Sequence, residues 1–203
     1  MPDGILRPGG FELTEQLVRL AKLKPGARIL DVGCGFGGSV AYLSSLGYRV
    51  TGIDISEALL EHGRELYPDH RLFVSNAEYM PFEDETFDAL LFECSLSLMD
   101  MDAVLTEALC ILRPSGKLLI SDVFYHSAEE FGKLLRLYGF EVTRIKDKTN
   151  VFEEFVAQLI MSTGSVDVLF DCEQWEEIKM AKPRYCLAIA RKKELLIRED
   201  NTD

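Results

Sequence analysis

The stretch RILDVGCGFGGSVAYLSSLGYRVTGIDIS, residues 28–56, decides the fold of this chain. A short apolar run leads into a glycine-rich loop, a segment with helical spacing follows up to Gly47, and a second apolar run comes next. A strand, a sharp loop, a helix and a second strand in this order are typical of a unit with two parallel strands. The sequence therefore predicts an α/β fold with a ligand-binding loop after its first strand.

The glycines of this loop fit two motifs at once. Gly33, Gly35 and Gly38 fit the dinucleotide pattern G-x-G-x-x-G, whereas Gly33, Gly35 and Gly37 fit D-x-G-x-G-x-G, with Asp31 just before them. Glycines let the backbone bend sharply and approach a ligand closely, so both motifs predict a bound ligand. The loop alone does not distinguish a pyrophosphate from a smaller, positively charged cofactor.

Two carboxylates at the strand ends narrow the choice of ligand. Asp31 would repel a pyrophosphate at close range, but it suits an ammonium or sulfonium group. Asp54 ends the second strand, where a carboxylate can accept hydrogen bonds from both ribose hydroxyls. Asp54 thus indicates a nucleoside, and Asp31 favours a cationic one.

Strand and helix patterns alternate beyond this unit. We expect a single α/β domain over residues 1–203, because parallel strands need helical crossovers that cover both sheet faces. Further strands are expected at 71–77, 87–95, 116–124, 140–148 and 184–193, and helices at 11–23, 57–67, 101–112 and 128–139. The pattern changes at Val151, where residues 151–183 form a helical insertion before the last strand.

Composition limits the partners and the compartment. The 203 residues carry a net charge of −12, which disfavours nucleic acid and anionic membranes as partners. No apolar run is long enough to span a membrane, and no secretory signal is recognisable. The five cysteines are odd in number and contain no C-x-x-C, which indicates a reducing, cytoplasmic location and no metal site.

Two downstream stretches carry a family resemblance. SNAEYMPFEDETFDALLF (75–92) and ILRPSGKLLISD (111–122), with the glycine motif, resemble class I S-adenosylmethionine-dependent methyltransferases. The resemblance runs from about Gly10 to Lys148 and is nearest to the small-molecule group with quinone-biosynthesis and arsenite methyltransferases. It implies a Rossmann-like seven-stranded, mostly parallel sheet in the order 3-2-1-4-5-7-6, with helices on both faces and strand seven antiparallel. It also implies S-adenosyl-L-methionine as the cofactor.

The resemblance assigns the methionine and ribose side of the cofactor to the first two strand ends. Asp31 would face the amino group of the methionine part, and Asp54 would hold the ribose. Three glycines would pass close to the cofactor: Gly33, Gly35 and Gly37.

Four further residues follow from the resemblance. Ile55 would pack on the adenine face, and Ala77 would offer its backbone N–H to the ring. Asn76 stands where the family often has an Asp, and its amide oxygen can accept the adenine amino hydrogen bond. Glu93 follows strand four, where backbone atoms contact the methionine part. The alternative readings are a turn residue for Asn76 and a solvated carboxylate for Glu93.

The reaction itself needs few protein groups. Transfer is an in-line displacement, for which the protein aligns the acceptor and excludes water, so no dedicated base is required. His126 follows strand five with Tyr125 and is the candidate catalytic base; the alternative is a surface loop histidine. Asp122 lies at the strand end itself. Cys94, near the expected methyl group, raises arsenite as a substrate, although the family's paired thiols are missing.

The insertion at about 151–183 is the expected cover of the acceptor site. Apolar residues between Val151 and Met161 form a stripe, and Trp175 and the N-terminal LRPGGF lie in segments that could close over the ligand. The plainer interpretation is a helix packed on the sheet.

Three functions are compared. The leading hypothesis is methyl transfer to a small-molecule acceptor. The alternative is a cofactor-binding sensor or partner subunit without transferase activity. A nicotinamide oxidoreductase is disfavoured by Asp31. The sequence does not indicate the acceptor or the oligomeric state.

Overall fold

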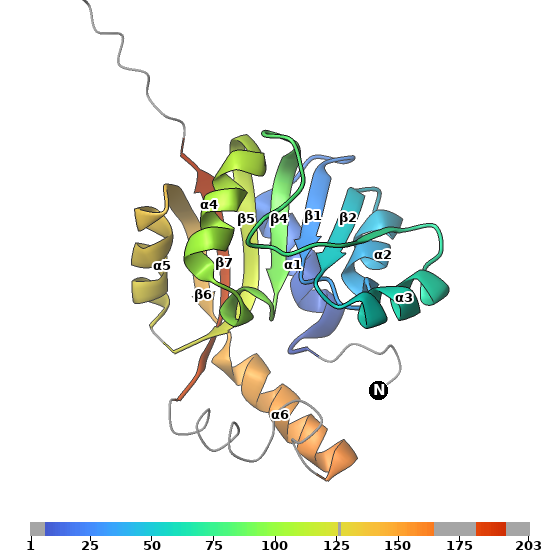
Figure 1. Ribbon diagram of the computed structural model, residues 1–203. Coiled ribbons are helices and arrows are strands. Elements are labelled where there is room, and N and C mark those ends of the chain that lie inside the picture. Colours follow the sequence, from blue (N-terminus) through green and yellow to red (C-terminus); the bar gives the residue numbers. More distant parts are fainter. Residues whose placement is uncertain (1–6, 126, 165–181, 194–203) are drawn as a thin grey trace, which may run out of the picture.

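The computed structural model describes residues 7–125, 127–164 and 182–193. Seven strands form one sheet in the order β3-β2-β1-β4-β5-β7-β6, as the sequence predicts (Figure 1). The strands are β1 (Arg28–Val32), β2 (Arg49–Asp54), β3 (Arg71–Val74), β4 (Phe87–Glu93), β5 (Leu112–Phe124), β6 (Phe140–Asp147) and β7 (Arg184–Lys192). The helices are α1 (Gly10–Ala21), α2 (Gly38–Ser45), α3 (Glu57–Leu66), the 3₁₀ turn η1 (Leu96–Leu98), α4 (Met101–Ile111), α5 (Ala128–Leu137) and α6 (Thr149–Thr163).

The quoted stretch forms the predicted unit. β1 and β2 pair in parallel, with Arg28 opposite Arg49 at one end and Val32 opposite Ile53 at the other. The helix between them, α2, ends just before Gly47, which has a φ of 87°. Ser56 caps the next helix by accepting a hydrogen bond from the backbone N–H of Leu59.

The last described strand of the chain lies inside the sheet rather than at its side. β7 runs antiparallel to both neighbours, β5 and β6, and lies between them. Its side chains are buried from Tyr185 to Ala190. The implied antiparallel strand seven is therefore confirmed.

β5 begins earlier than the sequence suggests. The sequence predicts this strand at 116–124, but β5 starts at Leu112. Leu112 lies opposite Phe87 and Lys117 opposite Ala89, so the extra residues of β5 form a bulge. Ser115 within the bulge has a φ of 60°.

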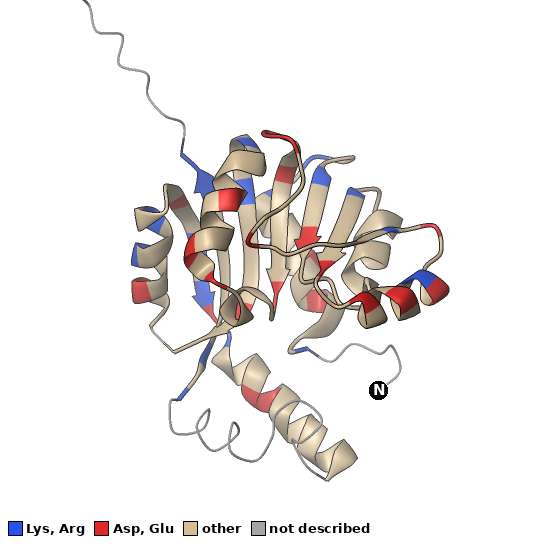
Figure 2. Ribbon diagram, viewed as in Figure 1, with Lys and Arg blue, Asp and Glu red and all other residues tan. Residues whose placement is uncertain are grey.

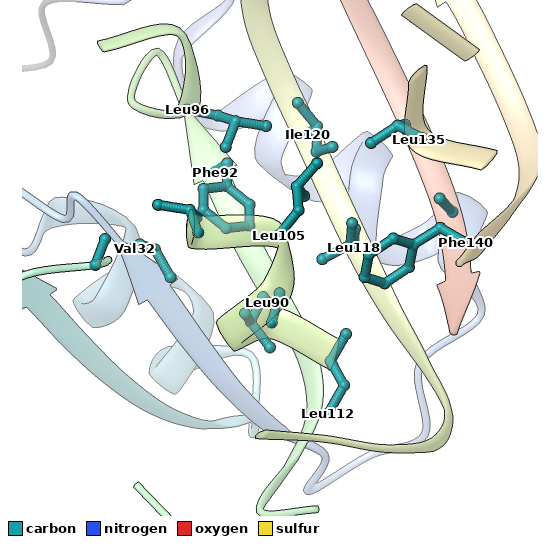
Figure 3. Packing of buried hydrophobic residues seen from close by; sticks show 14 of the residues in the cluster. Val32, Leu90, Phe92, Leu96, Leu105, Leu112, Leu118, Ile120, Leu135 and Phe140 are labelled. Atoms are coloured by element: carbon teal, nitrogen blue, oxygen red, sulfur yellow. The ribbon is translucent and has the colours of Figure 1, made fainter. Parts of the chain in front are cut away.

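Buried side chains fill both sides of the sheet. β4 shows why: Leu90 and Phe92 point to one face, and Ala89 and Leu91 to the other. The first face packs against α4 and α5 (Figure 3). The second packs against α1, α2 and the start of α6. Helices therefore cover both faces, as expected.

The expected insertion starts with α6, which begins at Thr149 rather than Val151. α6 extends beyond the end of the sheet where the parallel strands have their carboxyl ends (Figure 1). The second half of the predicted insertion, with Trp175, lies outside the described residues. No helix in the described part of the chain is both long and apolar enough to cross a membrane.

Candidate cofactor site

The glycine loop follows β1 at the carboxyl-end edge of the parallel strands. The backbone N–H groups of Gly33 and Cys34 both donate to the carbonyl of Ile53, at 2.8 and 3.0 Å. Gly33 has a φ of 75°, and a Cβ added there would stand 2.5 Å from the Cβ of Ser95. Only glycine fits this position, because both the backbone conformation and the space exclude a side chain.

Asp54 fixes the loop at the end of β2. One of its carboxylate oxygens accepts a 2.8 Å hydrogen bond from Gly35 N, and the other accepts a 2.9 Å bond from Ser56 N. A carboxylate oxygen can accept more than one hydrogen bond, so both oxygens can still accept one from a ribose hydroxyl. The geometry therefore fits the role that the family resemblance implies for Asp54.

A cavity of about 270 Å³ opens beside this loop. Its lining includes five of the predicted cofactor residues: Gly33, Asp54, Ile55, Asn76 and Ala77. It also includes residues that the sequence analysis did not single out: Ile53, Ser75, Glu78, Ser95, Leu98 and Met99. Ile55 is 74% exposed, so its apolar surface is free to pack against a ligand.

Asn76 takes part in a turn. Its side-chain oxygen accepts a 2.9 Å hydrogen bond from Glu78 N, which is the turn-residue arrangement considered above. Because an amide oxygen has two lone pairs, the turn leaves one acceptor position for an adenine amino group. Its neighbour Ala77 is buried against the cavity.

Asp31 is a buried acid at the end of β1. It is 2% exposed, and no described residue donates a hydrogen bond to its carboxylate. Burial, followed by the charge of Glu93, raises its pKa to about 8, Asp54 adds to the shift, and Arg7 opposes it. A cation beside Asp31 would relieve this cost, so the group fits an ammonium-bearing ligand and not a pyrophosphate.

The side chain of Glu93 is buried, and both of its carboxylate oxygens accept hydrogen bonds. Its two oxygens accept 2.6 Å hydrogen bonds from Thr14 Oγ1 and Ser39 Oγ. Arg7 Nη2 lies 3.1 Å away, and only 4% of the Glu93 side chain is exposed. The interpretation of Glu93 as a solvated carboxylate is therefore wrong, because its side chain is buried and protein groups from distant segments of the chain take the place of water.

Cys94 follows Glu93 and faces the cavity. Its Sγ lies 3.6 Å from the hydroxyl of Tyr185. Burial, and secondarily the charge of Asp122, raises the thiol pKa to about 12. The thiol is therefore protonated at neutral pH, which disfavours the thiolate that arsenite binding requires. Among the described residues, no group of His, Cys, Asp and Glu is placed to hold a metal ion.

Asp122 has a structural role at the end of β5. Its carboxylate accepts hydrogen bonds from Ser95 N, Ser97 N, Ser97 Oγ and Val123 N, at 2.7 to 3.1 Å. Burial raises its pKa, and these hydrogen bonds oppose the shift. The bonds hold the start of η1 against the cavity. Tyr125 is exposed, and His126 lies outside the described residues.

The structure thus brings the predicted residues together in one region, but only some of them line the cavity. Gly33, Asp54, Ile55, Asn76 and Ala77 line the cavity, whereas Asp31, Gly35, Gly37 and Glu93 are not in its lining. Local sequence does not reveal the supporting roles of several residues, because these roles depend on long-range contacts: Arg7, Thr14, Ser39, Ser95 and Asp122.

Comparisons with known proteins agree with this geometry. A family model described as a methyltransferase domain matches residues 30–120. The uncharacterized methyltransferase YodH of Bacillus subtilis is 32% identical over 161 residues, which cover 67% of this chain and 69% of YodH. Phosphoethanolamine N-methyltransferase 3 of Arabidopsis thaliana is 31% identical over 176 residues, but the chain spans only 36% of that protein.

Structural similarity points to the same fold. Phosphoethanolamine N-methyltransferase 2 of Haemonchus contortus, solved with S-adenosyl-L-methionine, superposes with a TM-score of 0.73 at 21% identity. The match covers 95% of this chain and 55% of that one. The buried Asp31, the glycine loop and the open acceptor positions of Asp54 agree with S-adenosyl-L-methionine as the cofactor. The family model and the similarity to YodH show that the chain belongs to the class I S-adenosylmethionine-dependent methyltransferase family, and S-adenosyl-L-methionine is its cofactor.

Proposed function

We propose that the protein transfers a methyl group to a small-molecule acceptor by in-line displacement. The observation that supports this most directly is the buried Asp31, which has no hydrogen-bond donor among the described residues and lies near two other carboxylates. A site with this charge stabilises a cationic cofactor. The cofactor supplies a methyl group that is already activated on a sulfonium.

The chain's own residues would bind and orient this cofactor. Asp31 would take the ammonium group, and Asp54 would hold the ribose while it keeps Gly35 in place. Ile55 would cover the adenine, and Asn76 and Ala77 would meet its polar edge. Fixing the donor in this way leaves the acceptor's approach as the remaining requirement of an in-line reaction.

Contacts between α6 and the N-terminal helix support a cover over the acceptor site, and such a cover favours a small molecule as substrate. The start of α6 meets the start of α1, because a Cβ added at Gly9 would stand 3.2 Å from Val151 Cγ1. Phe152 stacks on Tyr185 with ring centroids 6.2 Å apart. Tyr185 in turn contacts Cys94 beside the cavity. We therefore keep residues 151–183 and the N-terminal segment as the proposed cover, which would exclude water and large acceptors.

The net charge of −12 supports the same choice, since it repels nucleic acid. The described cysteines, Cys34, Cys94, Cys110 and Cys186, are all free thiols, which supports a cytoplasmic location.

His126 remains the proposed base for acceptors that must lose a proton. A His126→Asn variant should lower kcat and remove an ionisation from the kcat–pH profile, with KM for the cofactor unchanged. An unchanged pH profile would show that no base is used at this position.

The decisive experiment supplies labelled S-adenosylmethionine and fractionated metabolites, and identifies the labelled product. Phosphoethanolamine is the first pure compound to test, because relatives are named for it. An Asp31→Asn variant in parallel should give no product. If S-adenosylhomocysteine binds in a titration but no fraction yields product, the sensor or partner-subunit reading replaces this proposal. If NADH binds instead, the oxidoreductase reading does.

A further inference from the structure

Three arginines begin three adjacent strands. Arg28 starts β1, Arg49 starts β2 and Arg71 starts β3. Arg28 is paired with Arg49 across the sheet, and Arg71 is paired with Thr51. Paired residues of parallel strands point to the same face, as do residues two apart on one strand. The three side chains therefore leave one face of the sheet together, at the end where the parallel strands begin and opposite the cofactor site. Figure 2 shows basic residues at this end of the sheet.

No helix of the described residues covers this part of the face. The connection from β3 to β4, residues 75–86, contains no helix and crosses in front of β1 and β2 as a coil (Figure 1). It leaves a groove of about 770 Å³, lined by the three arginines. We call it the arginine groove; Tyr48, Phe73 and Phe82 contribute aromatic side chains to its lining.

None of the three guanidinium groups forms an ion pair with a described carboxylate, although, against the effect of burial, the charge of Arg28 helps to lower the pKa of nearby Asp88. Among the described residues, no carboxylate lies within 4 Å of the Arg28, Arg49 or Arg71 guanidinium, although other arginines of the chain form such pairs. Arg28 lies instead over the ring of Phe87, at 5.8 Å from its centroid. One acid, Asp69, is in the lining.

A histidine lies in the same groove. His70 lines it, and the ring Nδ1 is buried without a hydrogen-bond partner among the described residues. A buried unsatisfied polar atom is costly and calls for a partner. Three adjacent like charges also repel one another, so an anion between them would be stabilised by all of them.

We propose that the arginine groove binds a small molecule that carries two or more phosphate groups. Guanidinium groups bind phosphate oxygens through paired hydrogen bonds. Arg28 and Arg49 lie side by side on strands about 4.8 Å apart, and Arg71 is offset from Arg49 by two residues on the next strand. The volume of the groove suits a metabolite-sized ligand. The net charge of −12 repels a long polyanion that would extend beyond the groove, which favours a small ligand over nucleic acid.

The test is a calorimetric titration of the full-length protein with inorganic tripolyphosphate at about 0.01 M salt, where exposed charges are weakly screened. We expect saturable binding that disappears at about 1 M salt. Arg49→Gln should weaken it about tenfold or more, because it removes a charge-assisted interaction from the middle of the groove. The matched control is Arg144→Gln, an exposed arginine on β6, which should leave the affinity unchanged.

S-adenosylhomocysteine binding reports whether each variant is folded, since the cofactor site lies at the opposite edge. If Arg49→Gln loses it, Arg71→Gln on the outer strand takes its place. The proposal is overturned if folded groove variants bind tripolyphosphate as tightly as the natural protein, or if Arg144→Gln weakens binding equally. It is also overturned if a single-stranded oligonucleotide binds there and tripolyphosphate does not.

Discussion

Glu93 at the end of β4 accepts a 2.6 Å hydrogen bond from Thr14 of α1, which lies 79 residues earlier in the chain. The same carboxylate accepts a hydrogen bond from Ser39 of α2 and pairs with Arg7. One buried side chain thus joins two helices and the N-terminal segment to the strand end that borders the cofactor site. It also adds to the negative potential at Asp31.

Replacing Glu93 by Ala should lower the free energy of unfolding by about 3–5 kcal/mol, because it leaves Arg7 as a largely buried, unpaired charge. Urea unfolding measures the change. The control is Glu61→Ala, an exposed residue of α3, which should change stability by less than about 0.5 kcal/mol. Equal effects of the two substitutions would show that the buried network contributes nothing.

A pair of glycines tests how closely the loop approaches the cofactor. Gly35 and Gly26 both have positive φ values, 54° and 74°, and a Cβ added at either meets no protein atom within 4 Å. Alanine at either position should therefore cost a similar backbone strain of about 1 kcal/mol. Only Gly35→Ala places a methyl group where we expect the cofactor, so only it should weaken S-adenosylhomocysteine binding, by about tenfold or more.

Thermal unfolding and calorimetric titration of both variants separate strain from contact. Normal cofactor affinity in Gly35→Ala would argue against Gly35 as a cofactor-contacting residue. Loss of affinity in Gly26→Ala would mean that strain alone explains the result.

Asp31 should make stability depend on pH. Its pKa is raised to about 8 in the folded protein, above the value of about 3.9 for an unfolded chain, so the folded state holds the proton more tightly. Its contribution to stability therefore falls as pH rises from about 4 to 8, and the penalty is complete above that range. Asp31→Asn should be more stable than the natural protein, on the order of 5 kcal/mol at pH 8, because each unit of pKa shift corresponds to about 1.4 kcal/mol. A difference independent of pH across this window would refute the assignment.

The same group should release a proton when the cofactor binds. An ammonium group beside Asp31 lowers its pKa, so binding near pH 7 should release protons in proportion to the protonated fraction. Calorimetry in buffers of different ionisation enthalpy measures the release. Adenosine, which has no ammonium group, is the matched ligand and should release none, and Asp31→Asn should release none with either ligand.

Cys94 should be chemically inert at neutral pH. Burial raises its thiol pKa to about 12, whereas Cys110 is exposed on α4. Iodoacetamide near pH 7 should modify Cys110 and leave Cys94 unmodified, as peptide mass spectrometry would show. Cys94→Ser should retain methyl transfer. Rapid labelling of Cys94 would mean that a thiolate is present and would reopen the metalloid-binding hypothesis.

The fold could be predicted because its signals are local. Strands such as β1 and β4 are buried on both faces and therefore read as apolar runs, and the helices between them keep their spacing. The glycine loop and Asp54 are likewise close in sequence, so their relationship at the strand ends follows from the unit itself.

The supporting contacts could not be predicted, because they join distant segments. Nothing near Glu93 in the sequence shows that Thr14 and Ser39 donate hydrogen bonds to its carboxylate in place of water. The same holds for Asp122, whose partners Ser95 and Ser97 precede it by a whole strand and helix. The bulge in β5 is also set by tertiary pairing with β4 rather than by its own residues.

The position of β7 constrains how the protein is made. β6 is hydrogen-bonded to β7 alone, and β5 meets β7 on its outer side. During synthesis, the strands from β1 to β5 leave the ribosome able to pair with one another, but β6 emerges without a neighbour. More than thirty further residues, 148–183, must be synthesised before β7 can pair with β6. Nascent chains stalled before Arg184 should therefore expose to chaperones the edges of β5 and β6 that β7 covers in the folded protein, whereas chains released after Lys192 should not.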